Sequence, residues 1–111
     1  MEAKFTPGPW HIDHAIDCKG EDGYRYVFSP RGDLGAFIAK IRLKPWPKEQ
    51  EANARLIAAA PDMYEELECA KDVFRFYQSH HEFKGGTEKA IRNKEIADRI
   101  DRLLEKARGE A

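Results

Sequence analysis

The residues best suited to chemistry are basic and aromatic side chains in and beside the segment 25–48. This segment carries six Lys or Arg residues against one acidic residue, in a chain whose formal net charge is only −1. Guanidinium groups bind phosphates through paired hydrogen bonds, and aromatic rings stack on nucleobases. The same pattern also fits a solvated sheet face on which aromatic residues pack across strands. The residues are Arg25, Arg31, Lys40, Arg42, Lys44 and Lys48, with Tyr24, Tyr26 and Trp46 beside them.

Two further polar residues, Asn53 and Arg55, stand in the alanine-rich segment 51–60. Small side chains there allow another backbone or helix to approach closely, and asparagine is only a modest helix former. A polar side chain in such surroundings is expected to hydrogen-bond a partner. That partner is either a ligand or a helix cap or loop of the same chain.

The sequence contains none of the common catalytic or metal-binding motifs. His11 and His14 would project to opposite faces of a strand, and no third ligand stands at a recognisable spacing. The carboxylates Glu65–Glu66, Asp98 and Asp101 are expected on charged, solvated helix faces. We therefore predict a protein that is not an enzyme, has no catalytic residues and binds no metal or cofactor.

Composition narrows the range of partners. A chain of 111 residues predicts a single domain. Its near-zero net charge argues against general attraction to a nucleic acid polymer or a membrane surface. No apolar run approaches the roughly 20 residues of a membrane helix, and the two cysteines, Cys18 and Cys69, show no paired spacing. These features predict a cytoplasmic protein with two free thiols.

Alternating polar and apolar residues predict antiparallel strands over residues 10–16, 24–29 and 35–43. The prolines at 7 and 9 give an extended lead-in to Trp10, which we expect to anchor the core. The connections are too short for parallel crossovers. The third strand is expected to direct one row of residues to the core: Phe37, Ala39, Ile41 and Leu43.

Helical patterns follow from residue 48 onward. Strong helix formers predict a helix over 48–60, and we expect a new helix to begin at Pro61. Apolar residues at steps of four and three then predict two helices that form an antiparallel hairpin around the Gly85–Gly86 loop. The expected contact residues are Met63, Leu67, Ala70, Val73, Phe74 and Tyr77 on one helix, and Ile96, Ile100, Leu103, Leu104 and Ala107 on the other.

The predicted fold class is therefore α+β. An N-terminal antiparallel sheet of three to four strands precedes two to three helices, and the last two helices form the antiparallel hairpin. A single domain, 1–111, would comprise a sheet part, 1–48, and a helical part, 49–111. The helices from Pro61 onward carry more apolar surface than one small domain covers, so we predict a homo-oligomer built through them.

Two segments resemble a known family. The sequences TPGPW at 6–10 and NARLIAAAPDM at 53–63 resemble a widespread family of small proteins encoded by tailed phages and prophages. The predicted architecture, a sheet followed by helices that can pair between subunits, is similar to that of the first described Thoeris anti-defence family. That similarity implies a sponge, which oligomerises and sequesters a cyclic ADP-ribose-type immune signal without cleaving it.

These observations lead to one hypothesis and one rival. The hypothesis is a phage-encoded, non-catalytic anti-defence protein that sequesters a cyclic nucleotide immune signal, either of cyclic ADP-ribose type or a cyclic oligonucleotide. Its ligand-binding residues would be Arg25, Arg42 and Arg55 for phosphates, Trp10 or Trp46 for a base, and Asn53 for a base edge or ribose. The rival is an accessory protein that inhibits or scaffolds a host protein through its helical hairpin. A nucleotide requires these residues to converge in one pocket, whereas a protein partner requires an exposed apolar or strongly charged patch.

Overall fold

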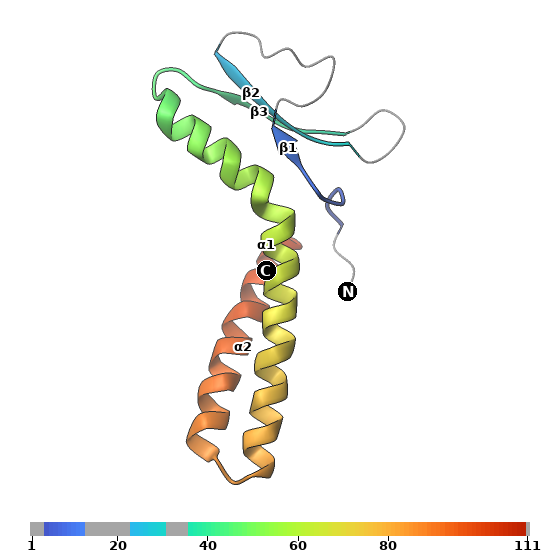
Figure 1. The fold of residues 1–111 in the computed structure, drawn as a ribbon, viewed down its shortest axis with the longest axis vertical. Coiled ribbons are helices and arrows are strands. Elements are labelled where there is room, and N and C mark those ends of the chain that lie inside the picture. Colours follow the sequence, from blue (N-terminus) through green and yellow to red (C-terminus); the bar gives the residue numbers. More distant parts are fainter. Residues whose placement is uncertain (1–3, 13–22, 31–35, 111) are drawn as a thin grey trace. The chain divides into compact units, whose positions relative to one another are not determined.

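The computed structural model describes residues 4–12, 23–30 and 36–110. It confirms the α+β fold, in which an antiparallel sheet precedes a helical hairpin (Figure 1). The elements are β1 (His11–Ile12), β2 (Tyr24–Ser29), β3 (Ala36–Arg42), α1 (Pro47–Phe83) and α2 (Thr87–Ala107). Several predicted features lie outside the described residues: strand positions 13–16, the turn at 31–33, His14 and Cys18.

The chain forms two compact units. Phe5–Asp62 make up one, which we call the sheet unit, and Met63–Ala111 with Met1–Lys4 make up the other, which we call the hairpin unit. The boundary between them falls inside α1. The first turns of α1 therefore belong with the sheet.

α1 is continuous through Pro61, so the prediction that a new helix begins there is wrong. A proline inside a helix cannot donate the usual hydrogen bond to the carbonyl four residues earlier. Packing compensates, because Pro61 is buried against the N-terminal lead-in. A Cβ atom on Gly8 would lie 3.0 Å from the Pro61 Cβ and 3.1 Å from its Cγ. Only glycine fits this contact without a shift of the proline ring.

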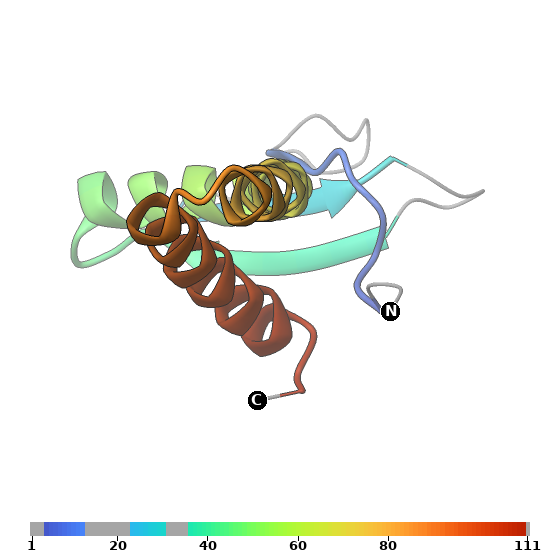
Figure 2. The ribbon, with the colours of Figure 1, turned by 90° about the horizontal axis from the view of Figure 1, so that it is seen from below.

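The core of the sheet unit lies between the sheet and the first half of α1, which runs along one sheet face (Figure 2). Its centre is formed by Val27, Ile41 and Ala54, and both Val27 and Ala54 are completely buried. The alanine lets the helix backbone approach the strands closely, as the small residues of this segment predicted. Six half-buried residues pack around this centre: Trp10, Ile12, Ile38, Ala39, Ile57 and Ala58.

The pairing of β3 departs from the predicted alternation at one position. Val27 lies opposite Ala39 and Phe28 lies opposite Phe37, so Ile38 is the extra residue of a β-bulge. A bulge interrupts the alternation of side chains between the two sheet faces. The prediction that Phe37 faces the core is therefore wrong, because its side chain is 68% exposed and Ile38 packs against the core instead.

The N-terminal lead-in is fixed by hydrogen bonds within the sheet unit. The Trp10 indole Nε1 donates to the Thr6 carbonyl over 3.0 Å. The Ser29 hydroxyl, which is completely buried, donates to the Pro7 carbonyl over 3.0 Å. The close approach of Gly8 to Pro61 and Asp62 adds a contact between this lead-in and α1.

Two rows of residues with heptad spacing form the contact between α1 and α2, and we call them the inner seam. Steps of three and four residues keep each row on one side of its helix. The α1 row is Tyr64, Leu67, Lys71, Phe74, Gln78 and His81, and the α2 row is Ala90, Asn93, Ala97, Ile100 and Leu104. All of these residues are buried or half-buried.

The inner seam only partly follows the predicted stripe. Residues that do lie in it are Leu67, Phe74, Ile100 and Leu104. Others are about half exposed: Met63 at 49%, Val73 at 50%, Tyr77 at 46% and Leu103 at 54%. The prediction followed apolar residues alone, alanines included, whereas the seam also contains the polar residues Lys71, Gln78, His81 and Asn93.

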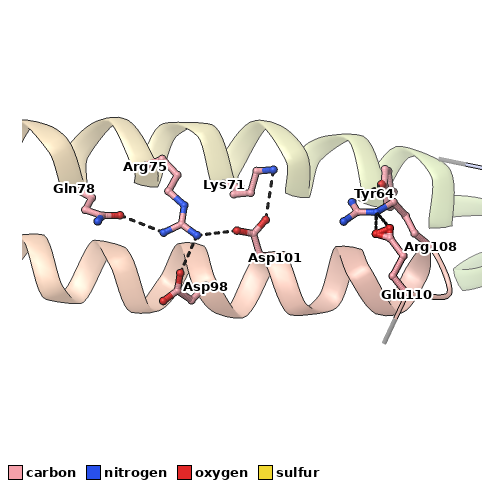
Figure 3. A network of polar contacts seen from close by, with 8 residues as sticks. All are labelled: Tyr64, Lys71, Arg75, Gln78, Asp98, Asp101, Arg108 and Glu110. Carbon is pink, nitrogen blue, oxygen red and sulfur yellow. Dashed lines mark hydrogen bonds and ion pairs between the residues drawn. The ribbon is translucent and has the colours of Figure 1, made fainter. Parts of the chain in front are cut away.

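A charged network crosses the inner seam (Figure 3). The Arg75 Nη2 atom donates to Asp98 Oδ1 over 2.8 Å and to Asp101 Oδ2 over 2.7 Å. Its Nη1 atom donates to the Gln78 side chain over 3.2 Å, and Lys71 Nζ lies 3.4 Å from Asp101 Oδ1. These side chains are about one-third exposed, so the network specifies how the helices align more than it stabilises them.

The turn between the helices and the chain end are also closed by hydrogen bonds. Gly85 has φ +77°, and the Gly86 N–H donates to the His81 carbonyl over 2.7 Å, which terminates α1 in a Schellman motif. Near the other end of the hairpin, Arg108 Nη1 donates to the Tyr64 hydroxyl over 3.1 Å (Figure 3). That bond, with a second to Glu110, raises the pKa of Arg108.

Acid should weaken the hairpin through the charged network that joins Lys71 and Arg75 to Asp98 and Asp101. Hydrogen bonds from Lys94 and Arg75 lower the pKa of Asp98. For Asp101, burial is the largest single effect and raises the pKa. The combined effect of Arg75 and Lys71 is larger, so the pKa of Asp101 is also lowered. A carboxyl whose pKa is lower in the folded state stabilises that state above the unfolded pKa of about 4, and this contribution is lost as pH falls through the folded pKa.

We therefore expect the melting temperature of the Asp98→Asn/Asp101→Asn variant to fall less steeply below about pH 4 than that of the parent. Circular dichroism melts between neutral and acid pH measure the difference. Asp72→Asn is the control, since Asp72 is exposed and makes no ion pair within the described part of the chain. Equal acid slopes for the parent and the double variant would contradict the prediction.

Candidate functional site

Arg42 and Asn53, two of the six predicted ligand-binding residues, lie in one groove between β3 and α1. The groove, which we call the β3–α1 groove, has a volume of about 480 Å³, inside the range of roughly 300–1,000 Å³ typical of small-molecule sites. It is lined by Lys40, Ile41 and Arg42 of β3 and by Gln50, Asn53, Leu56 and Ile57 of α1. Its lining therefore carries two cations, two amides and no carboxylate.

The polar groups of the groove differ in how far they are already engaged. Arg42 is exposed and makes no ion pair among residues 4–12, 23–30 and 36–110. Lys40 Nζ lies 4.2 Å from the centre of the Tyr24 ring. The Asn53 Nδ2 atom donates to Gln50 Oε1 over 2.7 Å, because positions three apart share one side of a helix. The Arg42 guanidinium is thus the group most available to an anion.

Arg25 and Arg55 lie on the other side of α1, in a second pocket that also contains Glu51. Arg25 Nη2 donates to Glu51 Oε1 over 2.7 Å, and Arg55 Nη2 lies 3.8 Å from Glu51 Oε2. Each arginine would have to exchange this carboxylate for a phosphate. The second pocket is therefore a weaker anion site than its two guanidinium groups suggest, because Glu51 already pairs with them.

The two tryptophans have opposite surroundings, and neither lines the groove. Trp10 packs against the core of the sheet unit and contacts Phe5 edge to face, with ring centres 6.2 Å apart. Trp46 is 64% exposed, and its carbonyl accepts the first hydrogen bond of α1, from the Gln50 N–H. Trp46 is thus the tryptophan free to stack on a base.

The six predicted residues do not converge in one pocket. The structure instead adds Lys40 and Gln50 to Arg42 and Asn53. Lys40 belongs to the basic segment recognised in the sequence, but nothing local distinguished it from Lys44 or Lys48. Gln50 could have been found by its position one turn before Asn53.

Other surfaces give weaker signals for a ligand. A depression of about 500 Å³ along α2 is lined by three arginines, two carboxylates and Ile96, so its charges nearly cancel. Within the ranges described, no three His, Cys, Asp or Glu side chains are grouped closely enough to hold a metal ion. Neither α1 nor α2 contains an apolar stretch that could cross a membrane.

The whole chain, residues 1–111, matches a protein family described as Salmonella phage P22 protein Y8K6. The chain belongs to this family. Membership confirms the predicted relation to small phage proteins, whereas the similarity to the Thoeris anti-defence family remains a prediction. No curated protein and no solved structure matches the chain significantly.

Proposed function

We propose that this phage protein is a non-catalytic binding protein that sequesters a cyclic nucleotide immune signal in the β3–α1 groove. The observation that supports this function best is the joint presence of Arg42 and Asn53 in a groove without carboxylates. The two residues were singled out for different chemical reasons, and they come from different elements. Both belong to the sheet unit.

Each part of a nucleotide would meet a matching group. Arg42 would donate two hydrogen bonds to a phosphate, and Lys40 would add a second positive charge. Asn53 and Gln50 carry amide groups that can pair with a ribose hydroxyl or a base edge. Leu56, which is 59% exposed, would cover an apolar face of the ligand.

The composition of the groove supports sequestration without cleavage. Its seven lining residues include no hydroxyl, thiol, imidazole or carboxylate, and their one amine, Lys40 Nζ, lies over the Tyr24 ring. A bound signal should therefore be released chemically unchanged when the protein is heated. In the host cytoplasm, such a protein would act by lowering the free concentration of the signal.

The test is a binding assay with a panel of cyclic ADP-ribose isomers and cyclic oligonucleotides. For a ligand that binds the parent, Arg42→Ala should weaken affinity roughly tenfold to a hundredfold, because it removes a charge-assisted hydrogen bond. Added salt should weaken binding as well. Arg55→Ala is the control: it removes an exposed arginine on the other side of α1, so it should change affinity little.

One result would reject the function, and a second would reject the β3–α1 groove as its site. One is the failure of every compound in the panel to raise the melting temperature at saturating concentration. The other is unchanged affinity in Arg42→Ala together with loss of affinity in Arg55→Ala. The latter result would place the ligand in the second pocket.

A further inference from the structure

α1 carries a second apolar row that the hairpin does not cover. Its members follow steps of four and three residues, the same spacing as the inner seam, and lie on the side of α1 away from α2. Three of them are large and exposed: Val73 at 50%, Phe76 at 66% and Phe83 at 87%. We call this row the outer seam: Cys69, Val73, Phe76, His80 and Phe83.

The outer seam is less polar than the contact inside the hairpin. The α1 row of the inner seam includes Lys71 and Gln78, and Arg75 lies beside them. Between Cys69 and Phe83 no member of the outer seam is an acid, a lysine or an arginine. Aromatic side chains in an exposed patch are typical of protein contacts. The outer seam is thus an exposed apolar row of the kind that a protein partner covers.

Phe76, at the middle of the outer seam, contacts two neighbouring rings, His80 of the same seam and Tyr77 beside it. Phe76 and Tyr77 lie edge to face with ring centres 5.6 Å apart. Phe76 and His80 are nearly parallel, with an interplanar angle of 12° and centres 6.4 Å apart. A partner helix would therefore meet aromatic rings that already contact one another.

We propose that the outer seam binds the outer seam of a second copy of this chain, with the two α1 helices antiparallel. Heptad spacing is self-complementary, since each row supplies both the inserted side chains and the spaces that receive them. This inference concerns the hairpin unit alone and does not depend on the nucleotide proposal.

Charge determines the antiparallel direction. The outer side of α1 is acidic at one end, at Glu65 and Glu66, and basic at the other, at Lys84. A parallel pair would place like charges side by side, whereas an antiparallel pair places each acidic end near the other copy's Lys84. In this arrangement Phe76 of one copy lies beside Tyr77 of the second copy. In the same register, Cys69 of one copy lies opposite Lys84 of the other.

The first experiment measures mass in solution by light scattering at micromolar concentration. The parent should have twice the chain mass of 12.8 kDa, and Val73→Glu and Phe76→Glu should each give the monomer. Ile91→Glu is the matched control, because Ile91 is a branched aliphatic residue of α2 with 52% exposure, and it should remain dimeric. Circular dichroism should show unchanged helix content in all variants.

The second experiment tests direction by disulfide formation in a Cys18→Ser background. Lys84→Cys should give a covalent dimer under mild oxidation through Cys69 of the other copy, whereas Cys69 alone should not. Positions 69 and 84 lie roughly 22 Å apart along one helix, at about 1.5 Å per residue, so they cannot bridge within a chain.

A monomeric parent would overturn the proposal and would leave the outer seam for a host protein. A dimer that survives both glutamate variants would overturn it as well. Efficient crosslinking of Cys69 to Cys69 with Lys84 intact would reject the antiparallel direction.

Discussion

Replacing Trp10 by alanine is expected to lower the free energy of unfolding of the sheet unit by about 3 kcal/mol or more. The indole packs against the core of this unit, and its Nε1 donates to the Thr6 carbonyl. The variant would lose apolar contacts, leave a cavity and remove the donor of that hydrogen bond. Denaturant unfolding can be followed by the fluorescence of Trp46, which remains.

Trp46→Ala provides the control for this measurement within the same unit. Its side chain is 64% exposed, so the free energy of unfolding should change by no more than about 0.5 kcal/mol. The two substitutions remove the same side chain and differ only in its surroundings. Similar melting temperatures for Trp10→Ala and the parent would show that the indole contributes no packing energy.

Leu104→Ala is expected to destabilise the hairpin unit by about 2–5 kcal/mol. Leu104 is completely buried and is the largest fully buried side chain of the described residues. It lies in the inner seam, whose other large apolar residues include Leu67, Phe74 and Ile100. Circular dichroism melts would report the loss, because the hairpin unit is helical.

Its neighbour Leu103 gives a control that differs by one position. Leu103 is 54% exposed, so Leu103→Ala should cost less than about 1 kcal/mol. This comparison also tests which side of α2 faces α1 in the inner seam. If Leu103→Ala were the more destabilising variant, α2 would meet α1 on the side that carries Leu103, and the inner seam would be wrong.

The candidate site was partly predictable, for reasons of distance along the chain. The excess of basic residues over 25–48 is a local property, and it identified Arg42. The pairing of Arg25 with Glu51 joins residues 26 positions apart, so no local pattern could show that this arginine is already neutralised. Lys40 joins the lining because the fold brings β3 beside α1, and no local pattern shows that contact.

By itself, the sequence determined the types of element, their order and the hairpin, since these depend on local periodicity, prolines and glycines. Tertiary structure decided which face each residue occupies. One bulge at Ile38 exposed Phe37, and of the two neighbouring leucines predicted for the helix contact, Leu103 and Leu104, only Leu104 is buried. It also kept α1 continuous, because the buried Pro61 packs against Gly8. The physical reason is that a one-residue change of register costs little locally, yet it reverses which side chains are buried.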